Sequence, residues 1–142
     1  MKDEEAFLKQ YEIMANTTQN VTLWRQNGNS FYLTLSTALL GFIIYTSNSV
    51  GVYEKIGMAC IGIVIAILWY YTIDYYRKLN NAKFDVIGIM EKKLPIKMFD
   101  LEWKTYKKDK SKDVTQIEKY LPIVFLIVYG LSLCYYAYLI LV

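Results

Sequence analysis

Two long stretches of this chain carry almost no charge. Between Ser30 and Tyr76 there are three charged residues, and between Leu121 and Val142 there are none. A water-soluble domain of 142 residues cannot cover its surface while leaving such runs uncharged. We therefore interpret the chain as an all-α integral membrane protein. It has three transmembrane helices, the second extended into the cytoplasm, and cytoplasmic amphipathic helices.

The apolar runs divide into three expected spans. The first is Phe31–Thr46, which is short beside the roughly 17–25 residues that a span needs but has polar flanks. The second is Ile56–Ile73, which follows a tight loop, "SNSVG", and ends in a cluster of tryptophan and tyrosine typical of a membrane interface. The third lies in the segment 120–142, where Pro122 predicts a kink. The segments 29–76 and 120–142 are therefore assigned to the membrane.

The segment 1–28 is predicted to be a separate amphipathic helix in the cytoplasm. Apolar residues recur at spacings of three and four, and three acids occupy the first turn, where the helix dipole favours negative charge. The stretch "RQNGN" (25–29) is expected to end this helix, and Ser30 to cap the next one. The expected apolar face consists of Phe7, Tyr11, Met14, Thr18 and Val21.

The second span is predicted to continue without interruption from Tyr53 to Lys93, and to leave the membrane near residue 76. The wet part of this helix has an apolar face at helical period: Leu79, Ala82, Val86, Ile87, Met90 and Leu94. Within the cytoplasmic segment 77–119 we then expect a short amphipathic helix in Leu94–Tyr106 and a solvated loop, "KKDKSKD". A capping box at Thr115–Glu118 is expected to start the last helix.

The basic residues predict the orientation. Twelve of the sixteen lysines and arginines lie between Arg77 and Lys119 and three precede Ser30. The positive-inside rule then places the N-terminus and the segment 77–119 of this multi-pass protein in the cytoplasm and the C-terminus outside. The lysine-rich loop is interpreted as solvated, so no nucleic-acid partner is expected.

The residue inventory argues against catalysis. The chain has no histidine, which removes the usual proton shuttle and every histidine-ligated metal site. Cys60 and Cys134 lie in apolar runs and are expected to be small packed residues rather than a metal pair or a disulfide. Asp74 is expected to pair with Arg77 or Lys78. We predict no enzyme activity, no catalytic residue, no bound metal and no cofactor.

The partners expected from the sequence are membrane lipids and further copies of the chain. About 70 residues outside the spans are too few and too fragmented to be stable alone, so self-association is predicted, with a cytoplasmic protein partner as a further possibility. Helix-packing or oligomer contacts are expected at small residues and at residues near the second-span exit: Gly62, Ala66, Asp74, Arg77, Asn80, Phe84 and Trp103. A similar line of small residues follows the third span at Gly130, Cys134 and Ala137.

The first span carries a polar stripe without charge, composed of Thr34, Thr37, Gly41, Tyr45 and Asn48. Two interpretations stay open. The hydroxyls can bond to their own backbone or to a neighbouring helix, or the stripe can line a pore between subunits.

Three stretches resemble one family. "RQNGNSFYLTLSTALLG" (25–41) resembles the entrance to the first span of the RipA-like family of small octameric membrane proteins. Trp69, Arg77, Asn80 and Phe84 match its second-span exit, and "EKKLPIKMFDLEWK" (91–104) resembles the segment that follows. The resemblance covers most of the chain from Arg25 to Pro122. It implies an eight-fold ring in the bacterial cytoplasmic membrane.

The family is similar to the small pore-forming accessory protein of RNA-targeting CRISPR systems, which implies a membrane effector in phage defence. Other members are linked to bacterial growth inside host cells. Some relatives carry an Arg-x4-His nuclease motif, but here Ala82 stands where the histidine would follow Arg77. The sequence therefore predicts a homo-oligomer that forms a pore or channel. The alternative is a membrane-anchored scaffold or sensor that docks a cytoplasmic partner without conducting.

Overall fold

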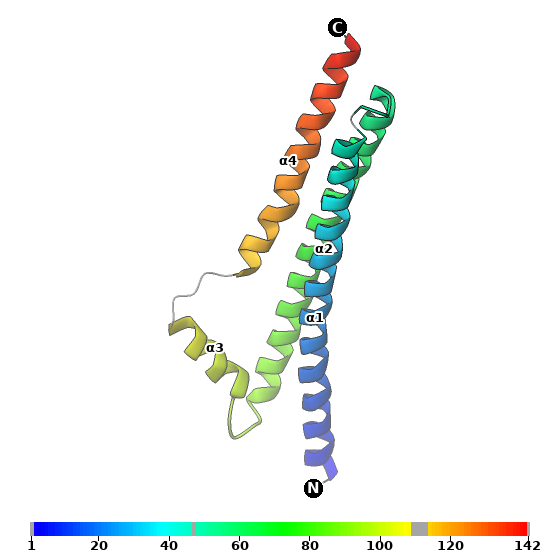
Figure 1. Cartoon of the computed structure of the whole chain (residues 1–142). Helices are drawn as coiled ribbons and strands as arrows, with labels where there is room; N and C mark the ends of the chain where they lie inside the picture. The colour runs from blue at the N-terminus through cyan, green and yellow to red at the C-terminus, as the bar shows by residue number, and fades with distance from the viewer. Residues whose placement is uncertain (1, 47, 109–113, 142) are drawn as a thin grey trace.

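The protein is a bundle of long helices, described by a computed structural model for residues 2–46, 48–108 and 114–141. Within these ranges the regular elements are α1 (Lys2–Tyr45), α2 (Val52–Glu91), α3 (Met98–Lys108) and α4 (Val114–Leu141). Among the described helices, α1, α2 and the 118–141 part of α4 are long and apolar enough to cross a membrane. Figure 1 shows α1 and α2 side by side, with α4 along their upper part and α3 at the lower end of α2. The predicted all-α membrane fold is confirmed.

Helix α1 is continuous from Lys2 to Tyr45, so the predicted break at "RQNGN" and the N-cap at Ser30 are wrong. A glycine inside a helix costs only about 1 kcal/mol relative to alanine, and this stretch has no proline. Contacts to other helices offset that cost, because Asn29 accepts a hydrogen bond from α2 and Arg25 pairs with α4. The segment predicted at 1–28 is therefore the N-terminal part of a longer helix.

Helices α1 and α2 pack as an antiparallel pair along a seam of coiled-coil type. In such a seam, residues spaced alternately by three and four positions face the partner helix. The residues of α1 that are buried or half-buried follow this spacing through the predicted break: Tyr11, Met14, Thr18, Val21, Arg25, Gly28 and Tyr32. Those of α2 do so along most of its length: Ala59, Gly62, Ala66, Trp69, Ile73, Tyr76, Asn80, Lys83 and Ile87.

Helix α4 packs on α2 in the half of the molecule with little charge. Its buried and half-buried residues also alternate by three and four: Pro122, Phe125, Tyr129, Ser132 and Tyr136. The ring of Tyr129 fills the space left by the missing side chain of Gly62, where a Cβ would lie 2.5 Å from Tyr129 Cε1. The Tyr129 hydroxyl continues past α2 and donates a hydrogen bond to the Ser36 carbonyl oxygen on α1, at 2.7 Å. One side chain thus joins all three long helices.

The rod predicted for the second helix is confirmed. Helix α2 has 40 residues, which at about 1.5 Å per residue is about 60 Å, roughly twice the hydrocarbon thickness of a bilayer. The expected boundary at residues 76–77 falls inside this helix. We use the term charged half for three parts taken together: α1 up to residue 28, α2 from residue 77, and α3. We call the rest of the molecule the apolar half.

The apolar face predicted for the charged half of α2 is only partly correct. Ile87 is fully buried, but Ala82 and Val86 are exposed. The buried seam lies to one side of the predicted face, and it takes up polar residues, Asn80, Lys83 and Glu91, that hydropathy alone does not select.

The short amphipathic helix is confirmed as α3, which extends to Lys108 and so includes the first two residues of the predicted loop. The rest of that loop, 109–113, lies outside the described residues. Helix α4 begins at Val114, one residue before the predicted cap at Thr115. Pro122 lies inside α4 and is buried.

Candidate functional site

The residues predicted to line a pore all lie on the outer surface of the protomer. Thr34, Thr37, Gly41 and Tyr45 are exposed on α1, and Asn48 is exposed in the turn after it. The Thr34 hydroxyl donates a hydrogen bond to the Ser30 carbonyl oxygen, and that of Thr37 to the carbonyl oxygen of Leu33, both at 2.8 Å. The hydroxyls thus bond to their own backbone, while their lone pairs remain open to water.

The same stripe extends over the full length of α1. Because the helix is unbroken, positions spaced by three, four or seven residues keep one direction from its first turn to its last. We call these residues the polar stripe; all are exposed, and they face away from the seam with α2: Glu5, Glu12, Asn16, Gln19, Leu23, Gln26, Ser30, Thr34, Thr37, Gly41 and Tyr45. The charged end of the stripe was not predicted from the sequence, because the helix was expected to end near residue 26. Counting at 3.6 residues per turn through Gly28 would have found it.

A fully buried tryptophan holds the three long helices together near the middle of the molecule. Trp69 Nε1 donates a hydrogen bond to Asn29 Oδ1 on α1 at 2.9 Å. The ring of Tyr32 stacks on the indole with centroids 6.1 Å apart, and Phe125 of α4 lies 5.9 Å from it on a tilted plane. These contacts fix the packing of α1, α2 and α4. Trp69 and Asn29 both belong to the stretches that carry the family resemblance.

Ion pairs surround this contact where the two halves meet. Asp74 on α2, in the last turn of the segment assigned to the membrane, binds Lys119 of α4 at 2.6 Å and Lys78 at 2.8 Å. Arg25 Nε of α1 lies 3.6 Å from Glu118 Oε2 of α4. The predicted pairing of Asp74 with Lys78 is confirmed, whereas Lys119, and not Arg77, is the second partner.

A buried carboxylate joins α1, α2 and α3 at the far end of the charged half. Glu91 is 1% exposed, and its Oε1 accepts hydrogen bonds from the Tyr11 hydroxyl at 3.0 Å and from the Phe99 backbone N–H at 2.8 Å. Its Oε2 accepts the Asp100 N–H at 3.3 Å. The carboxylate thus satisfies two N–H groups of the first turn of α3, where the helix dipole favours a negative charge.

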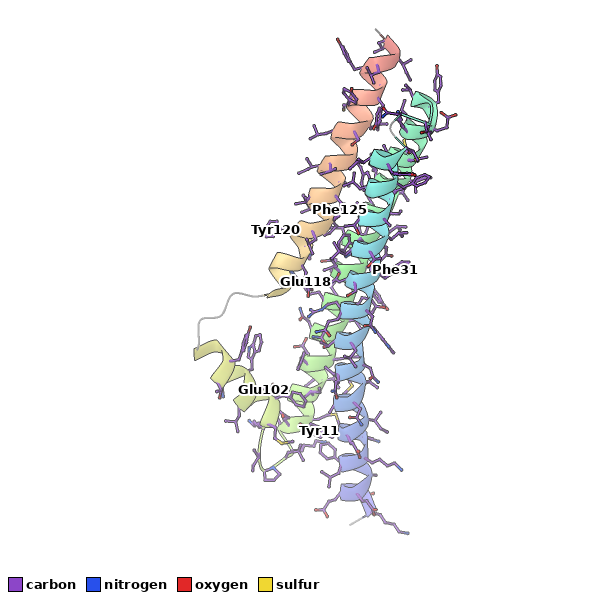
Figure 2. All side chains as sticks on the ribbon, in the orientation of Figure 1. Tyr11, Phe31, Glu102, Glu118, Tyr120 and Phe125 are labelled. Carbon is purple, nitrogen blue, oxygen red and sulfur yellow. The ribbon has the colours of Figure 1, made fainter. Side chains whose placement is uncertain are left out.

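Burial of the Tyr11 phenol, together with the hydrogen bond and the negative charge of Glu91, raises the pKa of Tyr11 to about 12. Figure 2 labels Tyr11 beside the lower end of α2, where α3 begins. From the sequence, Tyr11 is placed on an apolar face and no contact is predicted for Glu91. Neither residue type by itself signals a contact between positions 80 residues apart.

The other predicted contact residues differ in their surroundings. Ala66 is fully buried in the seam, and Gly62 contacts Tyr129, so both pack within the protomer. Arg77 is exposed, and Asn80 is half-buried with its Oδ1 lacking a hydrogen-bond partner within the described part of the chain.

Two predicted aromatic contacts involve α3. The ring of Phe84 contacts Phe99 of α3 with centroids 5.9 Å apart. Trp103 is 56% exposed and stacks on Tyr106 at 5.7 Å.

The cysteines are free thiols exposed on the surface of the protomer, so the small-residue packing expected of them does not occur within one protomer. The reason is their position on the helices, since Cys60 and Cys134 fall outside the buried spacings of α2 and α4. Ala137 is likewise exposed, and Gly130, although half-buried, has no neighbour within 4 Å of an added Cβ. Among the described residues, no three histidine, cysteine, aspartate or glutamate side chains are grouped to hold a metal ion.

Comparison with known proteins gives one match that covers nearly the whole chain. The model of a family described as the octameric membrane protein family (8xMP) matches residues 8–138. That range includes the seam, the Trp69 contact, α3 and nearly all of the three candidate spans. It leaves out residues 2–7 of the first span and residues 139–141 of the third. No curated protein and no solved structure matches the chain.

Proposed function

Since the chain belongs to the octameric membrane protein family, a family of self-associating membrane proteins, we propose that its copies form a ring around a pore lined by α1. The observation that supports this proposal is the polar stripe. It runs along one unbroken helix through the apolar half, and it faces away from the other helices of the same protomer. A lipid-facing helix gains nothing from such a stripe, whereas a helix at a water-filled axis needs one.

The ring has room for a pore of modest width. Packed helices lie no closer than about 9–10 Å axis to axis, so eight α1 helices of about 10 Å diameter around one axis leave a central opening of at least about 15 Å. Threonine hydroxyls and Gly41 line its membrane part, and Leu23 and Tyr45 are the large side chains that narrow it. The lining carries no charge within the membrane, which favours a passive path over ion-coupled transport.

Orientation and cellular role follow as part of the same proposal. The concentration of lysine and arginine between Arg77 and Lys119 supports a cytoplasmic location for the charged half, with the C-terminus outside a bacterial cytoplasmic membrane. The resemblance to accessory pore proteins of RNA-targeting CRISPR systems supports a role as a membrane effector in phage defence. The proposal assigns the chain no enzymatic activity, in keeping with its lack of histidine.

The test is conductance in planar bilayers of the purified octamer. Thr34→Leu with Thr37→Leu replaces two hydroxyls of the stripe by bulkier apolar groups and is expected to lower the single-channel current. The matched control is Ile61→Leu with Val64→Leu, which changes two exposed residues of α2 and is expected to leave the current unchanged. Equal currents in the parent and the threonine variant would count against α1 as the lining.

A second candidate function is a membrane-anchored scaffold or sensor that binds a cytoplasmic protein. The observation that favours it is α3, whose aromatic residues Trp103 and Tyr106 are largely exposed beside lysines. An octamer that never conducts, yet retains a protein partner which Trp103→Ala releases, would support the scaffold over the pore.

A further inference from the structure

One face of the α1–α2 pair is bare. Large apolar side chains line it on both helices, and each is 40–62% exposed: Ile13, Trp24 and Phe31 on α1, and Leu68, Tyr75 and Val86 on α2. On α1 the spacings of eleven and seven residues bring the three side chains to nearly one direction at 3.6 residues per turn. We call this surface the bare face.

The bare face lies opposite the side on which α3 and α4 pack. Residues two positions apart on an α-helix point about 160° apart. Tyr70 contacts α4, and Leu68, two positions earlier, points away from it. Phe84 contacts α3, and Val86, two positions later, points away from it. Each protomer therefore has one covered side and one uncovered side.

Lipid cannot cover the charged half of the bare face, which includes Ile13, Trp24 and Val86. Helix α3 lies in the same charged half and is largely exposed as well, with Met98 and Leu101, three positions apart on one side of it, each more than half accessible. Two apolar surfaces in water, on opposite sides of one protomer, are what a head-to-tail ring requires, because a cyclic interface joins two different patches. In a family described as octameric, the partner that covers both is the next copy of the chain.

The two surfaces lie at the same height. Contact between the rings of Tyr11 and Phe99, with centroids 6.4 Å apart, fixes the start of α3 at the level of Tyr11. Figure 1 shows α3 running obliquely upward from there, away from the long helices and toward the start of α4. Helix α3 is about 16 Å long and rises by less than that, so it stays within the stretch of about 16 Å from Ile13 to Trp24. Rotation about an axis along the helices keeps neighbouring copies at one height.

We propose that α3 of each copy packs on the bare face of the next copy, against α1 between Ile13 and Trp24. The inference rests on the ring of the proposed function and names its interface. Met98 and Leu101, exposed apolar residues whose side chains leave α3 on one side, would be the anchors.

Cysteine cross-linking in membranes tests the interface. In a background of Cys60→Ala with Cys134→Ala, one chain carries Asn20→Cys and a second, differently tagged chain carries Glu102→Cys. Asn20 lies between Ile13 and Trp24 on the same side of α1, and Glu102, labelled in Figure 2, lies one turn from Met98 and Tyr106 on α3. Both substitutions leave the apolar side chains intact.

A short bismaleimide is expected to join the two tagged chains. A single chain with both substitutions is expected to give a ladder of products that ends at eight copies. The matched control, Glu12→Cys with Glu102→Cys, places one thiol on the polar stripe and is expected to give several-fold less product.

The outcomes separate this inference from the proposed function. The octameric state is first verified by native mass. If such octamers give no product between Asn20→Cys and Glu102→Cys, the proposed interface is wrong, whether or not they conduct. Equal products from the control pair also overturn it. Cross-linked octamers that carry no current leave the interface standing and contradict the pore.

Discussion

The hydroxyl of Tyr11 on α1 donates a hydrogen bond to the carboxylate of Glu91 on α2, with 3.0 Å between the two oxygens. The same carboxylate accepts two backbone N–H groups of α3, so this pair fixes the place where α3 leaves the long helices. If α3 forms the contact between copies, the accuracy of that contact depends on Tyr11 and Glu91.

Replacing Tyr11 with phenylalanine should lower the stability of the charged half. The change removes one hydrogen bond to a buried carboxylate, which contributes about 1–2 kcal/mol, while the two bonds from α3 remain. The expected result is a lower melting temperature in detergent and faster hydrogen exchange at the amides of Phe99 and Asp100. Tyr53→Phe, at a site 74% exposed on α2, is the control and should change neither. Unchanged exchange in the Tyr11 variant would show that the bond does not hold α3.

The same hydroxyl predicts a pH dependence at the alkaline end. The pKa of Tyr11 is raised from 10.0 to about 12, so folding favours the neutral phenol. Its contribution to stability is complete below pH 10 and is lost as pH rises toward about 12. The difference in melting temperature between the parent and Tyr11→Phe should therefore shrink over this interval. A difference that stays constant from pH 9 to pH 12 would contradict the raised pKa.

Asp74 joins α2 to α4 through its ion pair with Lys119, at 2.6 Å. Asp74→Asn removes the negative charge and leaves the Lys119 ammonium without this partner. We expect the variant to have a lower melting temperature than the parent, as measured by thermal unfolding in detergent. The control is Asp85→Asn, at an exposed acid of the same helix, and it should match the parent.

A methyl group at Gly62 should separate α2 from α4. The added Cβ would lie 2.5 Å from the Tyr129 ring, a distance that forces the ring or the helices to move. Overpacking of this kind costs about 1–3 kcal/mol. We expect Gly62→Ala to lower the melting temperature, whereas Gly57→Ala, on the same helix with open space around it, should raise it slightly. Equal effects of the two substitutions would mean that the Tyr129 contact contributes little.

Much of the architecture could be predicted from charge and periodicity. The uncharged runs give the three membrane-spanning helices, and the absence of proline or a strong turn signal before Pro95 gives the long α2. The pairing of Asp74 with Lys78 follows from their spacing of four on one helix. Each of these features depends on residues that are close in the sequence.

The features that were missed depend on distant residues. The break expected at Gly28 rested on local turn preferences, and a seam of about six turns with α2 outweighs them. Lys119 and Tyr129 bind groups 45 and 93 positions away, and no local pattern selects them among the other lysines and tyrosines. The polar stripe was recognised only in the part of α1 that was expected to cross the membrane.

The unbroken α1 also has a mechanical consequence. Its 44 residues form one continuous helix of about 66 Å without a proline that could act as a hinge. A tilt of about 5° at one end moves the other by about 6 Å, given the rise of a helix. A force applied near Glu5 would therefore tilt the whole helix and displace Tyr45, without bending at an intervening hinge.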